Sequence, residues 1–196
     1  MSAINPQNGK LLYHLTHIDN LTSILKYGLQ PRKMLNSNSF TDSADPDIIL
    51  KREEYQLDTY VPFHFLPNTA FDNAVRYKNG STNCIYICIT RNLAIANNFK
   101  IIPRHPLNDH PGIFTYTEGF RTINWDLMNE NISNASSEDQ INIRMTKMAE
   151  CITNEIIYPD KFFCIYCSSK FIDRVLESTS KFPNIHVNEG VWFNND

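Results

Sequence analysis

The sequence predicts a single α+β domain, and three observations support this prediction. Strand-like segments alternate with short helical patterns, but they lack the regular β-α-β spacing that indicates a parallel sheet. No Gly-x-Gly-x-x-Gly motif follows a strand, so a Rossmann dinucleotide site is not expected. The 196 residues are enough for a substantial core, so we expect one domain over residues 1–196 with a polar N-terminal tail at residues 1–10.

Five segments rich in β-branched or aromatic residues are predicted to form strands. They span residues 11–15, 60–65, 83–90, 162–167 and 185–193. The second contains Pro62, which has no backbone N–H and restricts that strand to a sheet edge, a strand end or a bulge. At least two of its aromatic residues Tyr60, Phe63 and Phe65 are expected in the core. The third segment is almost entirely apolar and is the clearest buried strand.

Three segments are predicted to be helical, at residues 20–27, 137–152 and 170–178. Asp19 is expected to cap the first helix at its N-terminus. Gly28 is expected to end it, because glycine adopts the left-handed conformation of a helix C-terminus without strain. The second helix begins with Ser137 and Gln140 in the spacing of a capping box.

Two segments are predicted to be irregular. Residues 36–47 are polar with almost no apolar content, which is typical of a functional flap or a disordered loop. Residues 103–119 are rich in histidine, proline and other turn-forming residues, so they are expected to lie outside the core.

The composition excludes several classes of protein. With 42% hydrophobic and 20% charged residues, the sequence is typical of a globular protein and not of a disordered or membrane chain. No apolar run approaches the roughly 18 residues of a membrane-spanning helix. The N-terminus lacks the charged start and apolar core of a signal peptide. We therefore expect a cytoplasmic protein with no membrane partner.

The formal net charge is −3, which argues weakly against a protein that coats nucleic acid, because phosphate binding usually needs a basic surface. Basic residues in the middle of the chain are compatible with a local positive surface, and a mixed solvated surface explains them equally well. These residues are Arg76, Lys78, Arg91, Lys100, Arg104 and Arg121.

The five cysteines, an odd number, suit a reducing compartment. The pairs Cys84/Cys88 and Cys164/Cys167 have the spacing of zinc ligands, but each pair lies in an apolar run. In a strand, Cys84 and Cys88 would share a face, whereas Cys164 and Cys167 would point to opposite faces. Core packing is therefore favoured over a zinc site, and no metal is expected.

Four short segments in a fixed order carry a family resemblance. They are residues 13–21 (YHLTHIDNL), Lys51-Arg52, residues 60–65 (YVPFHF) and residues 148–150 (MAE). In combination they resemble the DarT family of NAD-dependent ADP-ribosyltransferases, toxins that attach ADP-ribose to a base in single-stranded DNA, with relatives that act on RNA. The resemblance runs from about Leu11 to the end of the chain. It implies NAD as co-substrate and narrows the fold to an ADP-ribosyltransferase-like split mixed β-sheet flanked by helices.

The resemblance implies that Glu150 and Arg52 are the catalytic residues. Cleavage of the glycosidic bond of NAD develops positive charge on the ribose, so an anion is needed near that ribose and cations are needed near the diphosphate. A carboxylate at Glu150 would stabilise the ribose and accept the proton of the attacking base nitrogen. The Arg52 guanidinium would bind phosphate and position the base. Glu155 and Lys51 are the neighbouring candidates for the same two roles. The alternative without a catalytic role is that Glu150 and Arg52 are ordinary surface residues.

The resemblance also implies cofactor-binding roles for His14, Thr16, Asn20 and His64. On a strand, His14 and Thr16 point to the same face, so one moiety of NAD would meet both. Asn20 has an alternative role as a helix cap. His64 stands where many family members carry a second tyrosine, and a histidine there can still stack or donate a hydrogen bond.

Aromatic residues and arginines between residues 103 and 137 are expected to shape a substrate groove, as the corresponding region does in the family. Tyr116 and Trp125 would stack on bases, while Arg104 and Arg121 would neutralise phosphates. Ordinary packing is the alternative, because aromatic residues and arginines are also common in cores.

These observations lead to the interpretation of a toxin-like transferase that moves ADP-ribose from NAD onto a nucleobase of single-stranded nucleic acid. DNA is the first choice of acceptor and RNA the second. The resemblance further implies a toxin-antitoxin system, a neutralising antitoxin protein as partner, and a role in antiviral defence. Two other classes stay open: an ADP-ribosyltransferase acting on protein or a small molecule, and a catalytically silent nucleotide-binding module.

Overall fold

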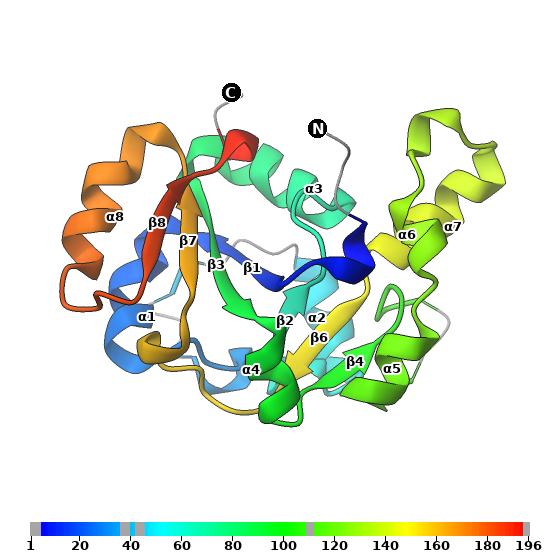
Figure 1. Ribbon diagram of the computed structural model, residues 1–196, viewed down its shortest axis with the longest axis horizontal. Helices are drawn as coiled ribbons and strands as arrows, with labels where there is room; N and C mark the ends of the chain where they lie inside the picture. The colour runs from blue at the N-terminus through cyan, green and yellow to red at the C-terminus, as the bar shows by residue number, and fades with distance from the viewer. Residues whose placement is uncertain (1–4, 36–39, 42–45, 109–111, 194–196) are drawn as a thin grey trace.

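The computed structural model describes residues 5–35, 40–41, 46–108 and 112–193. Within these ranges, strands and short helices are interspersed along the chain (Figure 1). The strands are β1 (Leu11–His17), β2 (Val61–His64), β3 (Cys84–Thr90), β4 (Lys100–Ile102), β5 (Phe114–Thr115), β6 (Glu150–Thr153), β7 (Cys164–Cys167) and β8 (His186–Glu189). The α-helices are α1 (Leu21–Tyr27), α2 (Pro46–Glu54), α3 (Ala70–Asn79), α4 (Arg91–Ala96), α5 (Tyr116–Thr122), α6 (Trp125–Asn129), α7 (Ser137–Lys147) and α8 (Ile172–Thr179).

The strands form one mixed sheet in the order β5-β4-β6-β2-β1-β3-β7-β8. Neighbouring strands are antiparallel except for β7 and β8, which are parallel. β1 pairs with β3 along its whole length, but its pairing with β2 in the described residues is limited to Tyr13 and His64. The sheet is therefore split between β1 and β2, which confirms the predicted fold class.

Pro62 lies at this split. In β2 it pairs with Ile152 of β6 on one side. On the other side, its carbonyl oxygen accepts a hydrogen bond of 2.8 Å from the His14 side chain. A proline inside a fully paired central strand would remove a ladder hydrogen bond. At the split, β1 and β2 are barely paired, so the missing N–H of Pro62 removes no ladder hydrogen bond between them.

β3 is buried along its length because both faces of the sheet are covered at this strand. Its isoleucines point into the larger core cluster, together with residues of α1, α4 and α8. Its cysteines and Tyr86 point to the opposite face, where they pack with Val75 of α3 and Phe193. Successive side chains of a strand alternate between faces, so the nearly continuous apolar run predicted for residues 83–90 fits a strand covered on both sides.

All five cysteines are free and buried. Cys84 and Cys88 lie in one apolar cluster, whereas Cys164 and Cys167 lie in different clusters. The described residues contain no group of three or more His, Cys, Asp or Glu that could hold a metal ion. The prediction of core packing for these cysteines is confirmed. None of the helices in the described ranges has both the length and the apolar character needed to span a membrane.

The start of α1 differs from the prediction. Asp19 does not cap the helix, because a 3-10 turn at Ile18–Asn20 precedes it. Asn20 occupies the N-cap position, and its side chain makes no capping hydrogen bond. The predicted end is correct: Gly28 has a φ of 84°, which glycine adopts more readily than other residues.

α7 also differs from the prediction at both ends. Its cap is Ser136, which accepts a hydrogen bond from the N–H of Asp139, and the predicted cap at Ser137 is wrong. The helix stops at Lys147, and the strand β6 begins at Glu150. The helical pattern predicted up to residue 152 is overridden because β6 pairs with both β2 and β4, which buries its residues in the sheet.

The irregular segments are only partly described. Residues 36–39 and 42–45 of the predicted polar loop lie outside the described residues, and Pro46 already begins α2. The predicted excursion at 103–119 is wrong in its second part, which contains β5 and the start of α5, while residues 109–111 lie outside the described residues. The last predicted strand ends at Glu189 and is followed by a 3-10 turn at Val191–Phe193.

Candidate active site

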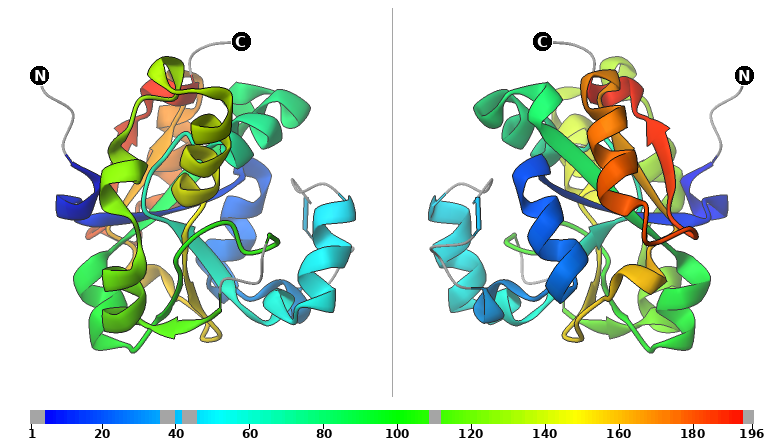
Figure 2. Two further views of the ribbon diagram at one scale, coloured as in Figure 1. Left: turned by 90° about the vertical axis from the view of Figure 1, so that its right-hand side faces the viewer. Right: turned by 90° about the vertical axis from the view of Figure 1, so that its left-hand side faces the viewer.

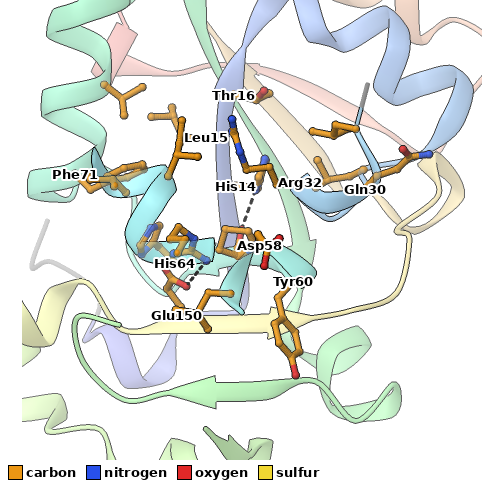
Figure 3. A pocket seen from close by; sticks show the side chains of 18 of the residues that line it. His14, Leu15, Thr16, Gln30, Arg32, Asp58, Tyr60, His64, Phe71 and Glu150 are labelled. Atoms are coloured by element: carbon orange, nitrogen blue, oxygen red, sulfur yellow. Dashed lines mark hydrogen bonds and ion pairs between the residues drawn. The ribbon is translucent and has the colours of Figure 1, made fainter. Parts of the chain in front are cut away.

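A pocket lies beside the split between β1 and β2 and gathers the residues predicted to act on NAD. Its wall includes His14, Thr16, Asn20, Arg52, His64 and Glu150. These residues come from β1, the turn before α1, α2, β2 and β6. Figure 3 shows His14 and Thr16 of β1, His64 of β2 and Glu150 of β6 around the pocket. The fold therefore brings together side chains that are far apart in the sequence.

Arg52 and Glu150 form a bidentate ion pair in this wall. Nη1 and Nη2 of Arg52 donate to Oε1 and Oε2 of Glu150, at 2.8 and 3.2 Å. The side chain of Glu150 is 5% exposed and that of Arg52 is 15% exposed, so water screens the pair weakly. The planar guanidinium matches the two carboxylate oxygens in a way that a lysine ammonium does not. The local alternatives Glu155 and Lys51 are exposed, and neither lines the pocket.

The surroundings of Glu150 keep its carboxylate ionised. Burial alone would raise the pKa of Glu150, but the charge and hydrogen bonds of Arg52 outweigh burial and lower the pKa below its ordinary value. His64 and His105 lower it further. At neutral pH the pocket therefore contains a buried anion that is balanced by Arg52.

His14 is a neutral ring with a defined tautomer. Its Nδ1 must carry the proton, because the Pro62 carbonyl oxygen to which it bonds can only accept. Burial lowers the pKa of His14 to about 4. Its Nε2 is therefore an unprotonated acceptor at neutral pH, suited to a hydroxyl or amide N–H of a substrate.

Asn20 fixes the wall beside His14. Its Nδ2 donates to Thr16 Oγ1 at 3.1 Å and to the Thr41 carbonyl oxygen at 2.9 Å, and its Oδ1 accepts from the Thr41 N–H at 2.8 Å. Asn20 thus pins the chain at Thr41 to the end of β1, and the alternative role of its side chain as a helix cap is wrong. Direct contacts from Thr16 and Asn20 to a cofactor stay a prediction.

Two histidines flank Glu150. His64 faces Glu150 in the β2/β6 pairing and is 6% exposed, and its Nδ1 has no hydrogen-bond partner among the described residues. His105 lines the same pocket, three positions after Ile102, the β4 residue that pairs with Glu150. Nδ1 of His105 accepts from the Leu107 N–H at 3.1 Å, so Nε2 carries the proton. The sequence pointed to His64 but not to His105.

The predicted substrate groove is wrong for its two aromatic residues. Trp125 is 7% exposed, packs edge-on against Phe65, and donates its indole N–H to the Phe120 carbonyl oxygen at 2.8 Å. Tyr116 is 9% exposed and stacks on the Phe120 ring. Rings buried in this way have no free face for a nucleic-acid base, so the packing alternative holds for both.

The four arginines among these basic residues fall into two groups. Arg76 and Arg91 are buried at 6% exposure and donate to groups of the protein, so they add nothing to a positive surface. Arg121 is exposed on α5, and Arg104 is partly exposed after β4. Neither Arg104 nor Arg121 lines the pocket, and their contact with phosphates stays a prediction.

The aromatic strand is divided between the core and the pocket. Phe63 and Phe65 are 0% and 2% exposed, which confirms that at least two of the three aromatic residues are core residues. Tyr60 lines the pocket, together with Asp58, Gln30 and Arg32, which the sequence did not single out.

The split mixed sheet, with Arg52 and Glu150 paired beside the split, agrees with the fold and the residue pair expected for an ADP-ribosyltransferase. Within this class the chain belongs to the DarT family, because the family model described as "ssDNA thymidine ADP-ribosyltransferase, DarT" matches residues 13–193. No curated protein matches the chain.

Solved structures with the same fold include two complexes of a Thermus protein. Thermus sp. 2.9 DarT in complex with ADP-ribosylated ssDNA is 21% identical, with a TM-score of 0.79 over 94% of this chain and 96% of that chain. The same protein in complex with NAD+ is 19% identical, with a TM-score of 0.72 over 95% and 98% of the two chains. Thermosipho africanus DarTG in complex with ADP-ribose is 19% identical, with a TM-score of 0.73 over 92% of this chain and 50% of that chain.

Proposed function

We propose that this chain transfers ADP-ribose from NAD onto a base of single-stranded DNA, with thymidine as the first acceptor to test. The observation that carries the proposal is the buried Arg52–Glu150 pair in a pocket at the split of the sheet. Membership of a family described as ssDNA thymidine ADP-ribosyltransferases supports the acceptor. The Thermus complexes with NAD+ and with ADP-ribosylated ssDNA support both donor and acceptor.

In this proposal Glu150 stabilises the reacting ribose of NAD. When the bond between C1′ and the nicotinamide nitrogen breaks, the bonding electrons leave with nicotinamide, which departs as a neutral molecule. Positive charge develops on the ribose, and an ionised, poorly screened carboxylate stabilises that charge. His14 supplies the neutral Nε2 acceptor for a hydroxyl or amide group of the nicotinamide riboside.

The acceptor base then attacks C1′ through a ring nitrogen and forms the new bond. The proton of that nitrogen passes to the Glu150 carboxylate and from there to solvent. Arg52 has to release one oxygen of Glu150 for this step, and the freed donors of its guanidinium can bind the diphosphate or a base carbonyl. Because Glu150 is 4% exposed, a stacked and paired base cannot reach it.

The test is incubation of the purified protein with labelled NAD and parallel pools of acceptors. The pools are single-stranded DNA with and without thymidine, the same sequences as duplex, single-stranded RNA, and protein. We expect label on thymidine-containing single strands and no label with Glu150→Gln. Preferential labelling of RNA would identify RNA, and not DNA, as the acceptor. Labelling of protein alone, or equal labelling of duplex and single strand, would contradict the nucleic-acid assignment.

A toxin role follows from this chemistry, since a base modified on its pairing edge no longer pairs. A cell that makes such an enzyme needs a partner protein that neutralises it. The matched Thermosipho protein is described as DarTG, and the match covers 50% of its chain. Arrest of an infected cell would also limit a virus, which is how a role in antiviral defence would arise. Growth arrest on expression of the wild type, but not of Glu150→Gln, would support the toxin role.

A further inference from the structure

The pocket continues from the catalytic pair to a second polar end. In Figure 3, His64 and Glu150 lie on one side of His14, whereas Gln30, Arg32, Asp58 and Tyr60 lie on the other side. A ligand that fills the pocket therefore meets an anion and histidines at one end and a different polar set at the other.

Two 3-10 turns build this second end. Arg32 lies in η3 (Arg32–Met34) and Asp58 lies in η4 (Leu57–Thr59), and the two turns contact each other. Gln56 precedes η4 with a φ of 57°, in the left-handed region, where it turns the chain after α2. As a result Arg52 and Asp58, on either side of this turn, both line the pocket.

The presence of Asp58 at this end of the pocket is not explained by the binding of a diphosphate. Arg32 is a cation and suits a diphosphate, but a carboxylate repels one. The Asp58 side chain is partly buried in the pocket wall, and in the described part of the chain it makes neither a hydrogen bond nor an ion pair. An ionised carboxylate only accepts hydrogen bonds, so the part of the ligand beside it must carry donors.

We propose that Asp58 binds the adenosine ribose of NAD through its 2′- and 3′-hydroxyls and thereby makes the pocket select NAD over NADP. This inference rests on the proposed function, which places the nicotinamide ribose at Glu150. The dinucleotide then extends toward Arg32, so the diphosphate lies between the two riboses and the adenosine ribose lies at the second end. That ribose has two neighbouring hydroxyl donors, which match the two carboxylate oxygens of Asp58.

NADP carries a phosphate in place of the 2′-hydroxyl hydrogen. This phosphate removes one donor and brings negative charge against the Asp58 carboxylate. Rossmann proteins use an acidic side chain on the ribose 2′-hydroxyl for the same discrimination, although they do so on an unrelated fold. In this proposal Arg32 faces the diphosphate that both dinucleotides share, so it does not favour NADP over NAD.

The experiment compares the wild type with Asp58→Asn, which keeps the shape of the side chain and removes its charge. The matched control is Asp160→Asn, an exposed aspartate outside the pocket. Transfer to a single-stranded oligonucleotide is measured with NAD and with NADP, and kcat and KM are determined for each. Thermal unfolding of each variant verifies that it is folded.

We expect the wild type to prefer NAD, and we expect Asp58→Asn to lower the NAD-to-NADP ratio of kcat/KM by roughly tenfold or more. The change should fall mainly on KM, because in this proposal the diphosphate separates the ribose at Asp58 from the bond that breaks. Asp160→Asn should leave the ratio unchanged.

Three outcomes would overturn the inference. The first is an unchanged ratio in Asp58→Asn, and the second is equal use of the two dinucleotides by the wild type. The third is an altered preference for NAD over its hypoxanthine analogue with no altered preference over NADP, which would place Asp58 at the adenine amino group. Failure of the wild type to consume either dinucleotide would instead contradict the proposed function, so the two failures are distinguishable.

Discussion

The two walls of the pocket are built in different ways. The β1 wall belongs to the sheet, and its residues His14, Thr16 and Asn20 are hydrogen-bonded within the protein. α2, which carries Arg52, has no buried residue and lies at the outer margin of the fold in the side views of Figure 2. Arg52 connects it to Glu150 in the sheet. One wall is therefore preformed by packing, whereas the other is held at the site by charge.

Removal of the negative charge of Glu150 should have the largest effect. Glu150→Gln removes the carboxylate charge with little change in volume, and it should lower the rate of transfer by about 10³-fold or more, since the charge acts both on the ribose and as the base. NAD binding should be largely retained. Single-turnover rates measure this effect, and Glu155→Gln, an exposed glutamate five positions later, is the control. A near-normal rate in Glu150→Gln would remove Glu150 from the catalytic role.

Loss of Arg52 should separate the two walls. Arg52→Ala leaves the buried Glu150 carboxylate without its partner, so it should lower transfer by about a hundredfold and destabilise the fold by roughly 2 kcal/mol. Amide hydrogen exchange should become faster in α2 and stay unchanged in β1. Arg52→Lys should restore part of the loss, because an ammonium replaces the charge but not the planar fork.

The control for Arg52 is Lys51→Ala, at an exposed neighbouring position on the same helix. It should change neither the rate nor the exchange of α2. Equal acceleration of exchange in α2 and β1 after Arg52→Ala would show that both walls depend on the ion pair, so that the β1 wall is not preformed.

The contrast between the walls also explains what the sequence could predict. The face shared by His14 and Thr16 follows from alternation in a strand, and the context of Glu150 follows from a short motif. His105 and Asp58 lie in segments without apolar periodicity. Their places in the pocket depend on the pairing of β4 with β6 and on the contact between two 3-10 turns, which are long-range interactions that no local pattern encodes.

Errors in the predicted groove have a related cause. Arginine and aromatic residues have the same local signature in a core and in a nucleic-acid groove. Trp125 and Tyr116 became core residues because Phe65 and Phe120 pack against them. The helical pattern of residues 137–152 extends into β6, because the partners β2 and β4 that impose the strand come from distant parts of the chain.

A smaller effect is expected inside the preformed wall. Asn20→Ala removes three buried or partly buried hydrogen bonds and leaves the Thr41 backbone groups without these partners, so it should destabilise the fold by roughly 2 kcal/mol. Asn97→Ala is the matched control, since Asn97 is exposed and donates to the Leu93 carbonyl oxygen at a helix end. Chemical denaturation of both variants measures the difference. An Asn20→Ala effect as small as that of Asn97→Ala would show that the wall is not fixed by Asn20.

The smallest effect should come from the protonation of His14. Its folded-state pKa of about 4 lies below the ordinary value of 6.5, so the unfolded chain binds the proton more readily. The stability linked to His14 is therefore complete above pH 6.5 and is lost as the pH falls toward 4, by about 1 to 2 kcal/mol between pH 7 and pH 5. Protonation of Glu150 contributes little in this window, because the stability linked to its lowered pKa is lost mainly below the ordinary value of 4.5.

His14→Gln isolates this contribution, because a glutamine amide can still donate to the Pro62 carbonyl oxygen but does not titrate. Denaturation at pH 7, 6 and 5 should show a shallower loss of stability in His14→Gln than in the wild type. His186→Gln, at an exposed position on β8, should follow the wild type. Parallel pH profiles for the wild type and His14→Gln would mean that His14 binds a proton equally well in the folded and the unfolded chain. The His14 side chain would then be solvated and not buried in the pocket wall.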